Sequence, residues 1–299
     1  MPAFLLALAL WSGAPPEEAN LSAILDRVSE EAEAFLNLAP RIIGTETWHQ
    51  RVQKPARRLR LRVGKSALER PAARIEERRI VCEYGFGQFK DSPGTLHELR
   101  TVVSVDGRPV AAQAEARQSL ALGITSDDDR HKRRILSRFQ RYGLAAAAVD
   151  FGQLVLMFTR RQLASYEFES LGERRLGPHA ALALTYRQRQ GEAAFTIFEG
   201  NRAHRMPLGG ELWVRRGDLL PLRISLRGAF HDGKHQIEHR ASVEYFPSAY
   251  GLVLPASVHY QKLADGEVIV EHLATYSNFR MFKADTEIRF ESAPVEAAR

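Results

Sequence analysis

The strongest constraint on this chain is an alternation of apolar and polar side chains that recurs from residue 80 to residue 276. An apolar side chain at every second position is typical of a strand with one buried face. Turn sequences such as Asp106-Gly107 separate the runs, and strands joined by short turns form antiparallel sheets. The sequence therefore predicts one large antiparallel sheet. The predicted strands cover residues 80–86, 99–105, 181–187, 194–198, 212–215, 220–226, 242–246, 253–261 and 268–276.

Two stretches follow a helical period instead. In the first, apolar residues recur at steps of three and four, Asn20 can cap the first turn and Pro40 stops the pattern, so we expect a helix over residues 20–37. A second helix is predicted over residues 126–142, with Ser126 as its cap and three aspartates at the positive end of its dipole. The apolar face of each predicted helix must be buried, and we expect it to pack on a face of the sheet.

The composition excludes several classes of protein. The chain has 299 residues, of which 44% are hydrophobic, so it can bury a core and is not a disordered protein. A single cysteine, Cys82, excludes an intramolecular disulfide framework and a Cys-rich zinc module. No apolar run reaches the 18 or more residues of a membrane-spanning helix. Because we find no linker and no repeat, we expect a single α+β domain over residues 20–290.

The N-terminus predicts export. Ala3 to Trp11 is a nine-residue apolar run, too short to span a bilayer, and Ser12-Gly13-Ala14 follows it. Such a run before small residues is typical of a secretory signal, which would occupy residues 1–14. The alternative is an apolar N-terminus of a cytosolic protein, since no Lys or Arg lies in the first ten residues. We expect a soluble periplasmic or secreted protein.

The charge is concentrated in one segment. Residues 51–79 contain eleven Lys or Arg and three acids, a net charge of +8, whereas the whole chain has a formal charge of +6. One interpretation is a surface for anionic lipid headgroups or another polyanion. The other is the outer face of strands, because arginines alternate there with leucine and valine. Nucleic acid is not expected, since aromatic residues are not interleaved with the basic ones. In the first interpretation, the contact residues are Arg57, Arg58, Arg60 and Arg62.

The most specific motif is His235-Gln236-Ile237-Glu238-His239, which matches the inverted zinc-protease pattern H-x-x-E-H. That chemistry requires a helix, where residues four apart share one face. Here the motif leads into an alternating run, and in a strand the two histidines would be about 13 Å apart at about 3.3 Å per residue. We therefore expect no metal site, but a turn with surface-exposed histidines.

No catalytic constellation is predicted, and no cofactor. The sequence contains no G-x-S-x-G, and Cys82 lies on the apolar side of a predicted strand, where a buried, unreactive thiol is expected. The acidic residues show no spacing that defines a pair for acid–base catalysis. We expect a binding protein rather than an enzyme, and the alternative is a hydrolase of unrecognised type.

Several segments of the second half carry a resemblance to a known family. They are Gly210-Glu211-Leu212-Trp213-Val214-Arg215, Leu220-Pro221-Leu222-Arg223-Ile224, Val243-Glu244-Tyr245, Gly251-Leu252-Val253-Leu254-Pro255 and Tyr276-Ser277-Asn278-Phe279-Arg280. In this order they resemble the LolA/LolB-type fold of periplasmic lipoprotein carriers. The chain as a whole also resembles uncharacterised secreted proteins of soil acidobacteria. The LolA-like resemblance implies a curved, unclosed antiparallel half-barrel with helices covering its concave side, which holds an acyl chain or an apolar peptide.

We therefore expect an exported protein with an apolar cavity for a lipid or a lipoprotein. The alternative is a periplasmic sensor or assembly factor that binds an envelope protein through a sheet edge or the basic segment, and an anionic membrane surface is a further possible partner of that segment. The residues expected to line the cavity are Trp213, Leu222, Ile224, Leu226, Tyr84, Phe86 and Tyr245.

Overall fold

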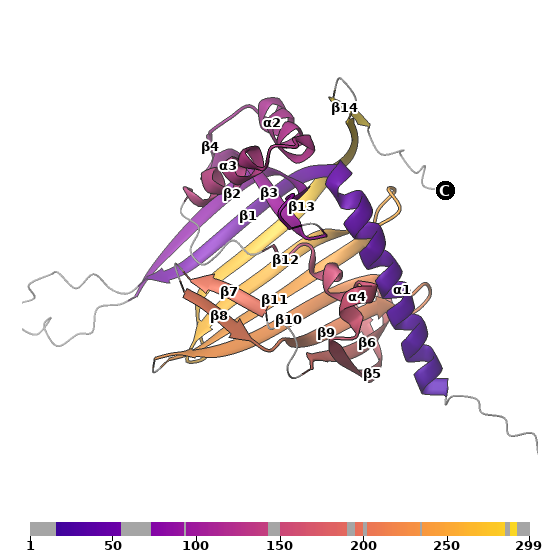
Figure 1. Cartoon of the computed structure of the whole chain (residues 1–299). Helices are drawn as coiled ribbons and strands as arrows, with labels where there is room; N and C mark the ends of the chain where they lie inside the picture. The colour runs from indigo at the N-terminus through magenta and orange to yellow at the C-terminus, as the bar shows by residue number, and fades with distance from the viewer. Residues whose placement is uncertain are drawn as a thin grey trace, which may run out of the picture.

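The computed structural model describes residues 16–54, 73–92, 94–142, 150–189, 195–199, 202–233, 235–284 and 288–291. Its core is one twelve-stranded antiparallel sheet, with the strands in the order β4-β3-β2-β1-β13-β12-β11-β10-β9-β6-β5 and β14 paired to β13 (Figure 1). Within the described residues β4 and β5 do not pair, so the sheet is not closed. This confirms the predicted α+β half-barrel.

The first six strands of the sheet along the chain are β1 (Ile42–Lys54), β2 (Arg74–Gln88), β3 (Leu96–Val105), β4 (Arg108–Pro109), β5 (Tyr166–Leu176) and β6 (His179–Gln188). The other six are β9 (Gly209–Arg215), β10 (Pro221–Asp232), β11 (His235–Pro247), β12 (Val253–Ala264), β13 (Glu267–Ala284) and β14 (Ile288–Glu291). A separate hairpin is formed by β7 (Phe195–Glu199) and β8 (Arg202–Met206).

Tight turns determine the register of two hairpins. Val105 pairs with Arg108, which leaves Asp106 and Gly107 as a two-residue loop, and both have positive φ, of 50° and 78°. Asp265 and Gly266 repeat this geometry between β12 and β13. Such φ angles suit Asp-Gly and match the twist of the flanking strands. The turn predicted at Asp106-Gly107 is therefore present, and the turn at Asp265-Gly266 has the same sequence and the same geometry.

The inner face of the sheet is the face covered by helix α1 (Pro16–Leu38). The helix buries Ile24, Val28, Ala32 and Phe35 against the core, and the rings of Phe35 and Phe86 meet edge to face at 5.0 Å. It ends before the short 3-10 helix η1 (Ala39–Arg41), which contains Pro40. The predicted helix is thus confirmed, and it begins four residues earlier than its sequence pattern indicates.

A second segment covers the inner face beside α1. It contains the 3-10 helix η3 (Leu154–Phe158) and the short helix α4 (Arg160–Leu163), which lies next to α1 (Figure 1). The backbone N–H of Arg160 donates to Glu33 of α1 at 3.2 Å. The Tyr245 hydroxyl of β11 donates to the Gly152 carbonyl at 3.1 Å and accepts from the Val155 N–H at 3.0 Å. These contacts join the segment to α1 and to the sheet.

The outer face carries α2 (Gln113–Thr125) at the β1–β3 end of the sheet, and α3 (Asp129–Gln140) lies at the margin beside β3 (Figure 1). Ile43 and Leu99 pack there against Leu120 of α2 and Ile135 of α3. Phe139 of α3 instead belongs to the inner core, so α3 contacts both hydrophobic clusters.

For this region the sequence prediction is wrong in the number of helices and in the residue that caps α3. It expects one helix from residue 126, whereas two helices are present, and α3 is capped by Asp128, whose side chain accepts from the Arg130 N–H. Ser126 accepts from the Asp128 N–H just outside the helix. Because α2 has only a weak amphipathic pattern, its sequence does not stand out.

Two predicted segments lie outside the described residues. These are the signal-like leader, residues 1–14, and most of the basic segment, including Arg57, Arg58, Arg60 and Arg62. In the described part of the chain, no helix combines the length and hydrophobicity needed to cross a membrane.

Candidate functional site

The inner face contains a buried ionic cluster, which we define as Arg100, Glu46, Glu98 and Asp150. Arg100 on β3 is 3% exposed, and its Nε lies 2.7 Å from Oε2 of Glu46 on β1. A second ion pair joins Arg100 to Glu98, two residues earlier on the same strand. Asp150 lies at the edge of this group, 3.9 Å from Arg100 Nη1 and 3.4 Å from His97 Nδ1. Strand alternation places Glu98 and Arg100 on the same face of the sheet.

Aromatic rings enclose the guanidinium. The Cζ atom of Arg100 lies 5.1 Å from the ring centre of Trp48, 5.4 Å from that of Tyr84 and 5.3 Å from that of Phe139. Such cation–π contacts strengthen when water is excluded. Arg100 thus combines ion pairs with a three-sided aromatic cage, an arrangement suited to holding a cation rigidly in the core.

Burial controls the electrostatics of the cluster. It raises the pKa of Glu98 from 4.5 to about 8, an effect that Arg100 opposes and the carboxylate of Asp150 reinforces. For Arg100, burial alone would lower the pKa, but Glu46 and Glu98 together hold it well above its ordinary value. Burial also raises the pKa of the Tyr84 hydroxyl. The cluster therefore keeps Arg100 charged and favours a protonated Glu98 near neutral pH.

Three polar atoms around Arg100 are buried without a hydrogen bond of normal geometry: Trp48 Nε1, the Tyr84 hydroxyl and Glu98 Oε1. Gly152 lies against two of them. A Cβ atom at this position would be 2.6 Å from the Tyr84 hydroxyl and 2.7 Å from Glu98 Oε1, so no larger residue fits without displacing them. Buried polar groups that make no hydrogen bond are costly, and three of those in the described residues lie around Arg100.

Next to the cluster lies a pocket of about 460 Å³ at the junction of β3, β4, α2 and α3, which we call the arginine pocket. Arg100 and Phe139 line its inner end, and Arg138 and Arg141 lie at its exposed side. Thr101 and Ser119 contribute hydroxyl groups. No carboxylate is among its described lining residues. The complete lining is Arg100, Thr101, Val102, Val110, Ala111, Ser119, Ile135, Arg138, Phe139, Arg141 and Tyr142.

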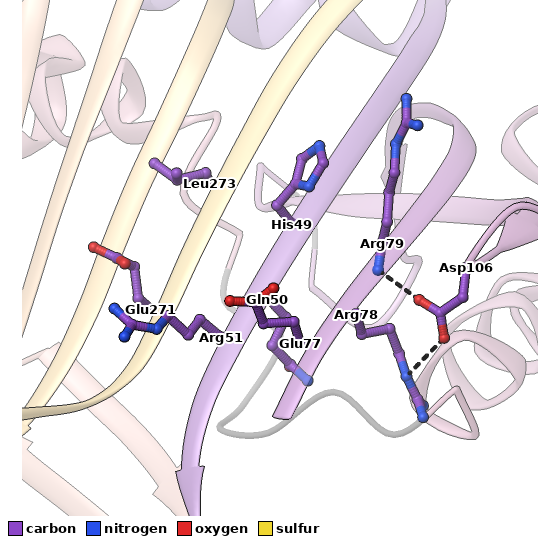
Figure 2. Close-up of a pocket in the computed structure, with 9 residues that line it drawn as sticks. All are labelled: His49, Gln50, Arg51, Glu77, Arg78, Arg79, Asp106, Glu271 and Leu273. Atoms are coloured by element: carbon purple, nitrogen blue, oxygen red, sulfur yellow. Dashed lines mark hydrogen bonds and ion pairs between the residues drawn. The ribbon is translucent and has the colours of Figure 1, made fainter. Parts of the chain in front are cut away.

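A second pocket, of about 440 Å³, lies on strands β1, β2 and β13 beside Asp106 (Figure 2). Its cations face acids: Arg51 pairs in register with Glu77 and with Glu271 on the neighbouring strands. Asp106 accepts from the Arg79 N–H at 2.8 Å and lies 3.7 Å from Arg78 Nε. With three arginines and three acids in its lining, this polar pocket is close to neutral, unlike the arginine pocket.

The predicted lining residues occupy three different environments. Tyr84, Phe86, Ile224, Leu226 and Tyr245 belong to one buried cluster on the inner face. Leu222 is buried on β10 but is not a member of that cluster. Trp213 points to the opposite face from Leu212 and Val214, is half-buried, and donates from Nε1 to Glu211 at 2.8 Å. That these residues contact a ligand stays a prediction.

The zinc-protease pattern does not form a metal site. His235 and His239 lie on strand β11 and not in the predicted turn, and His235 is exposed next to Asp265, as expected. His239, in contrast to the prediction, is buried, with Nδ1 2.8 Å from the Tyr260 hydroxyl, because alternation turns it toward the inner face. In the part of the chain that the structure describes, no three His, Cys, Asp or Glu side chains could hold a metal ion. Cys82 is buried, as predicted, and burial raises its pKa well above the ordinary value.

The sequence analysis missed the buried ionic cluster. A signal was present: Glu46 stands two positions before Trp48, and Glu98 and Arg100 stand two apart in a strand with apolar neighbours. A charge at a position where alternation requires an apolar side chain must be paired when the strand folds. Spacing alone does not show which residues on another strand are the partners.

Comparisons with known proteins give structural neighbours only. No protein-family model and no curated protein matches the chain. A DUF1329 family protein from Desulfovibrio piger is similar with a TM-score of 0.39 and 12% identity, over 87% of this chain and 92% of that one. A LolA superfamily protein, NE2245 from Nitrosomonas europaea, has a TM-score of 0.30 and 10% identity, over 89% and 94%. MucB in complex with MucA(peri) has a TM-score of 0.19 and 11% identity, over 86% and 93%.

These neighbours include the family that the sequence resembles, the LolA superfamily. The resemblance to acidobacterial proteins stays a prediction. Because every TM-score is below 0.5, the function is argued below from the residues of this chain alone.

Proposed function

We propose that this chain is an exported binding protein that holds a lipid, or the acyl chain of a lipoprotein, between the inner face of its sheet and the helices covering that face. The observation that supports this most directly is the nature of the cover. A hydrophobic cluster extends along the inner face from β2 to β6 beside the buried ionic cluster, and α1 and the segment 150–163 cover it together with the β7–β8 hairpin, whose Met206 lies against Gly228 of β10. Helical segments from two separate parts of the chain thus form part of the cover. A helix can move away from a sheet without breaking the hydrogen bonds between strands.

Few polar contacts hold α1 in place. Glu31 accepts from the Val253 N–H of β12 at 3.2 Å, and Glu33 accepts from the Arg160 N–H at 3.2 Å. The ion pair between Glu31 and Arg27, at 2.6 Å, lies within α1 itself. Both described pockets lie away from α1, so a lipid would have to displace α1 and the segment 150–163 from the sheet. An acyl chain would then replace the apolar side chains of α1 as the cover of the inner face.

We propose binding rather than catalysis because arginine side chains already engage the buried carboxyl groups near the candidate site. The buried carboxyl groups of Glu46 and Glu98 both contact Arg100, and the carboxylate of Glu83 is paired with Arg117. Carboxylates used in this way support the fold and hold neighbouring side chains in position.

The test is native purification from an exporting host, followed by native mass spectrometry and lipid extraction. We expect a bound lipid or acylated peptide in about one copy per chain. In uptake measurements with a fluorescent fatty acid, Glu31→Ala should accelerate binding, because it removes the contact between α1 and β12. The matched control is Glu30→Ala, which changes the neighbouring exposed acid of the same helix. Ligand-free protein that shows no saturable uptake of the fatty acid would contradict the proposal.

The second candidate is binding of an envelope protein at a sheet edge, and one observation favours it. Strand β5 has a hydrogen-bonded neighbour on one side only among the described strands, and most of its residues are exposed. Free edges can accept a strand from a partner. In this case a pull-down partner should persist after lipid removal. If the basic segment contributes to it, the partner is lost when Arg57, Arg58, Arg60 and Arg62 are changed to Ser.

A further inference from the structure

The arginine pocket combines positive charge with a lack of acidic partners. Arg138 and Arg141 are exposed, and no carboxylate of a described residue forms an ion pair with either. Three other cations of α3 are paired, Arg130 with Asp128 at 3.0 Å, Lys132 with Asp129 at 3.3 Å and Arg133 with Asp91 at 2.5 Å. Arg134 also has no acidic partner among the described residues, but it does not line the pocket. The helix dipole favours a cation in its last turn, but it does not explain why two arginines and Arg100 line one pocket.

The pocket also offers hydroxyl groups. Thr101 Oγ1 is buried and has no hydrogen-bond partner, and Ser119 of α2 lines the same space. Guanidinium and hydroxyl groups together are the usual donors to phosphate and carboxylate oxygens. An oxyanion bound in this pocket would accept hydrogen bonds from groups that have no partner among the described residues, such as the Thr101 hydroxyl.

The wall of the pocket is apolar. Val110 of the loop after β4 is 47% exposed, and Ile135 and Phe139 of α3 complete this side. Phe139 also packs on Trp48, with ring centres 6.1 Å apart, and so connects the pocket to the inner core. A ligand with an anionic end and an apolar end would match both parts of the lining.

We propose that the arginine pocket binds the oxyanion headgroup, phosphate or carboxylate, of an amphiphilic ligand. Arg138 and Arg141 contact the headgroup from the solvent side, Thr101 and Ser119 donate to it, and Arg100 provides positive charge at the inner end. This inference rests on the proposed function, since it assigns the headgroup site of the same lipid cargo. The part of the apolar chain next to the headgroup lies against Phe139, which packs on Trp48 of the inner core.

The test is calorimetric titration of the full chain with dodecyl phosphate below its critical micelle concentration, at two salt concentrations. We expect saturable binding that weakens at higher salt, because an exposed charge contact is screened. Arg138→Gln and Arg141→Gln should each lower the affinity by about tenfold or more. Arg134→Gln is the matched control, since Arg134 is an exposed arginine of the same helix that does not line the pocket.

Two further titrations identify the source of the anion. If inorganic phosphate displaces dodecyl phosphate only weakly and dodecanol does not bind, both ends of the ligand are required, which supports an amphiphile. If inorganic phosphate binds as tightly as dodecyl phosphate, the amphiphile proposal is overturned in favour of a free anion. Absence of saturable binding, or an equal loss in all three arginine variants, would overturn the site itself.

The site and the carrier function fail in different ways. Co-purified lipid whose binding does not depend on Arg138 or Arg141 would overturn the headgroup site alone. Arginine-dependent binding of dodecyl phosphate by a chain that never co-purifies with lipid would overturn the carrier function alone.

Discussion

At the scale of single residues, Glu98 makes stability depend on pH. Burial raises its folded-state pKa to about 8, above the ordinary 4.5, so the stability that this group provides is complete below about pH 4.5 and is lost as the pH rises toward 8. Glu98→Gln mimics the protonated side chain and removes this dependence. We expect the free energy of unfolding of the wild type, relative to the variant, to fall between pH 5 and pH 8 by at most about 1.4 kcal/mol per pH unit.

Urea denaturation of both proteins across this pH range measures the effect. A difference between wild type and Glu98→Gln that stays constant from pH 5 to pH 9 would show that Glu98 is ionised in the folded protein over the whole range. In that case the ion pair with Arg100 outweighs the burial of the carboxylate.

At the scale of elements, Glu83 connects α2 to the sheet. Its buried carboxylate accepts from Gln113 Nε2 at 2.8 Å and from Arg117 Nε at 3.0 Å. Glu83→Ala leaves both donors without this acceptor, and since the Arg117 side chain is partly exposed, we expect a cost of about 2 to 3 kcal/mol. Hydrogen exchange should accelerate in α2 and stay unchanged in α1. The matched control is Glu115→Ala, which changes an exposed acid of α2. It should change neither the free energy of unfolding nor the hydrogen exchange of α2.

A comparison of the helices and strands shows which parts of the fold can be predicted from the sequence. The strands and α1 are predicted because their apolar residues recur at steps of two or of three to four, and burial on one face requires that spacing. Helix α2 is missed because three of its four buried residues, Ala116, Ala121 and Gly123, are small, and small residues give a weak apolar stripe. In the candidate site, Tyr84 and Phe86 are predicted to be inward-facing, whereas the ion pair between Glu46 and Arg100 joins residues 54 positions apart. Such a pair depends on strand order, which local patterns do not specify.

At the scale of the whole molecule, a single hydrophobic cluster extends along the inner face. It includes Ile80 of β2, toward one end of the sheet, and Leu184 of β6, toward the other. A lid that opens for a ligand must therefore uncover part of a shared core, while the strands beneath it remain paired. The proposed carrier function requires this division of roles, in which the sheet stays paired while the cover moves.

A continuous core also predicts that the chain unfolds as one unit. Ile80→Ala and Leu184→Ala each remove a fully or almost fully buried side chain, and each should cost about 2 to 5 kcal/mol. Both variants should lower the midpoint of one and the same transition, followed by circular dichroism and by tryptophan fluorescence. Leu273→Ala, at a leucine that is 47% exposed on β13, is the control and should change stability by less than about 0.5 kcal/mol. Two transitions, each sensitive to only one of the core variants, would instead divide the sheet into two independently stable halves.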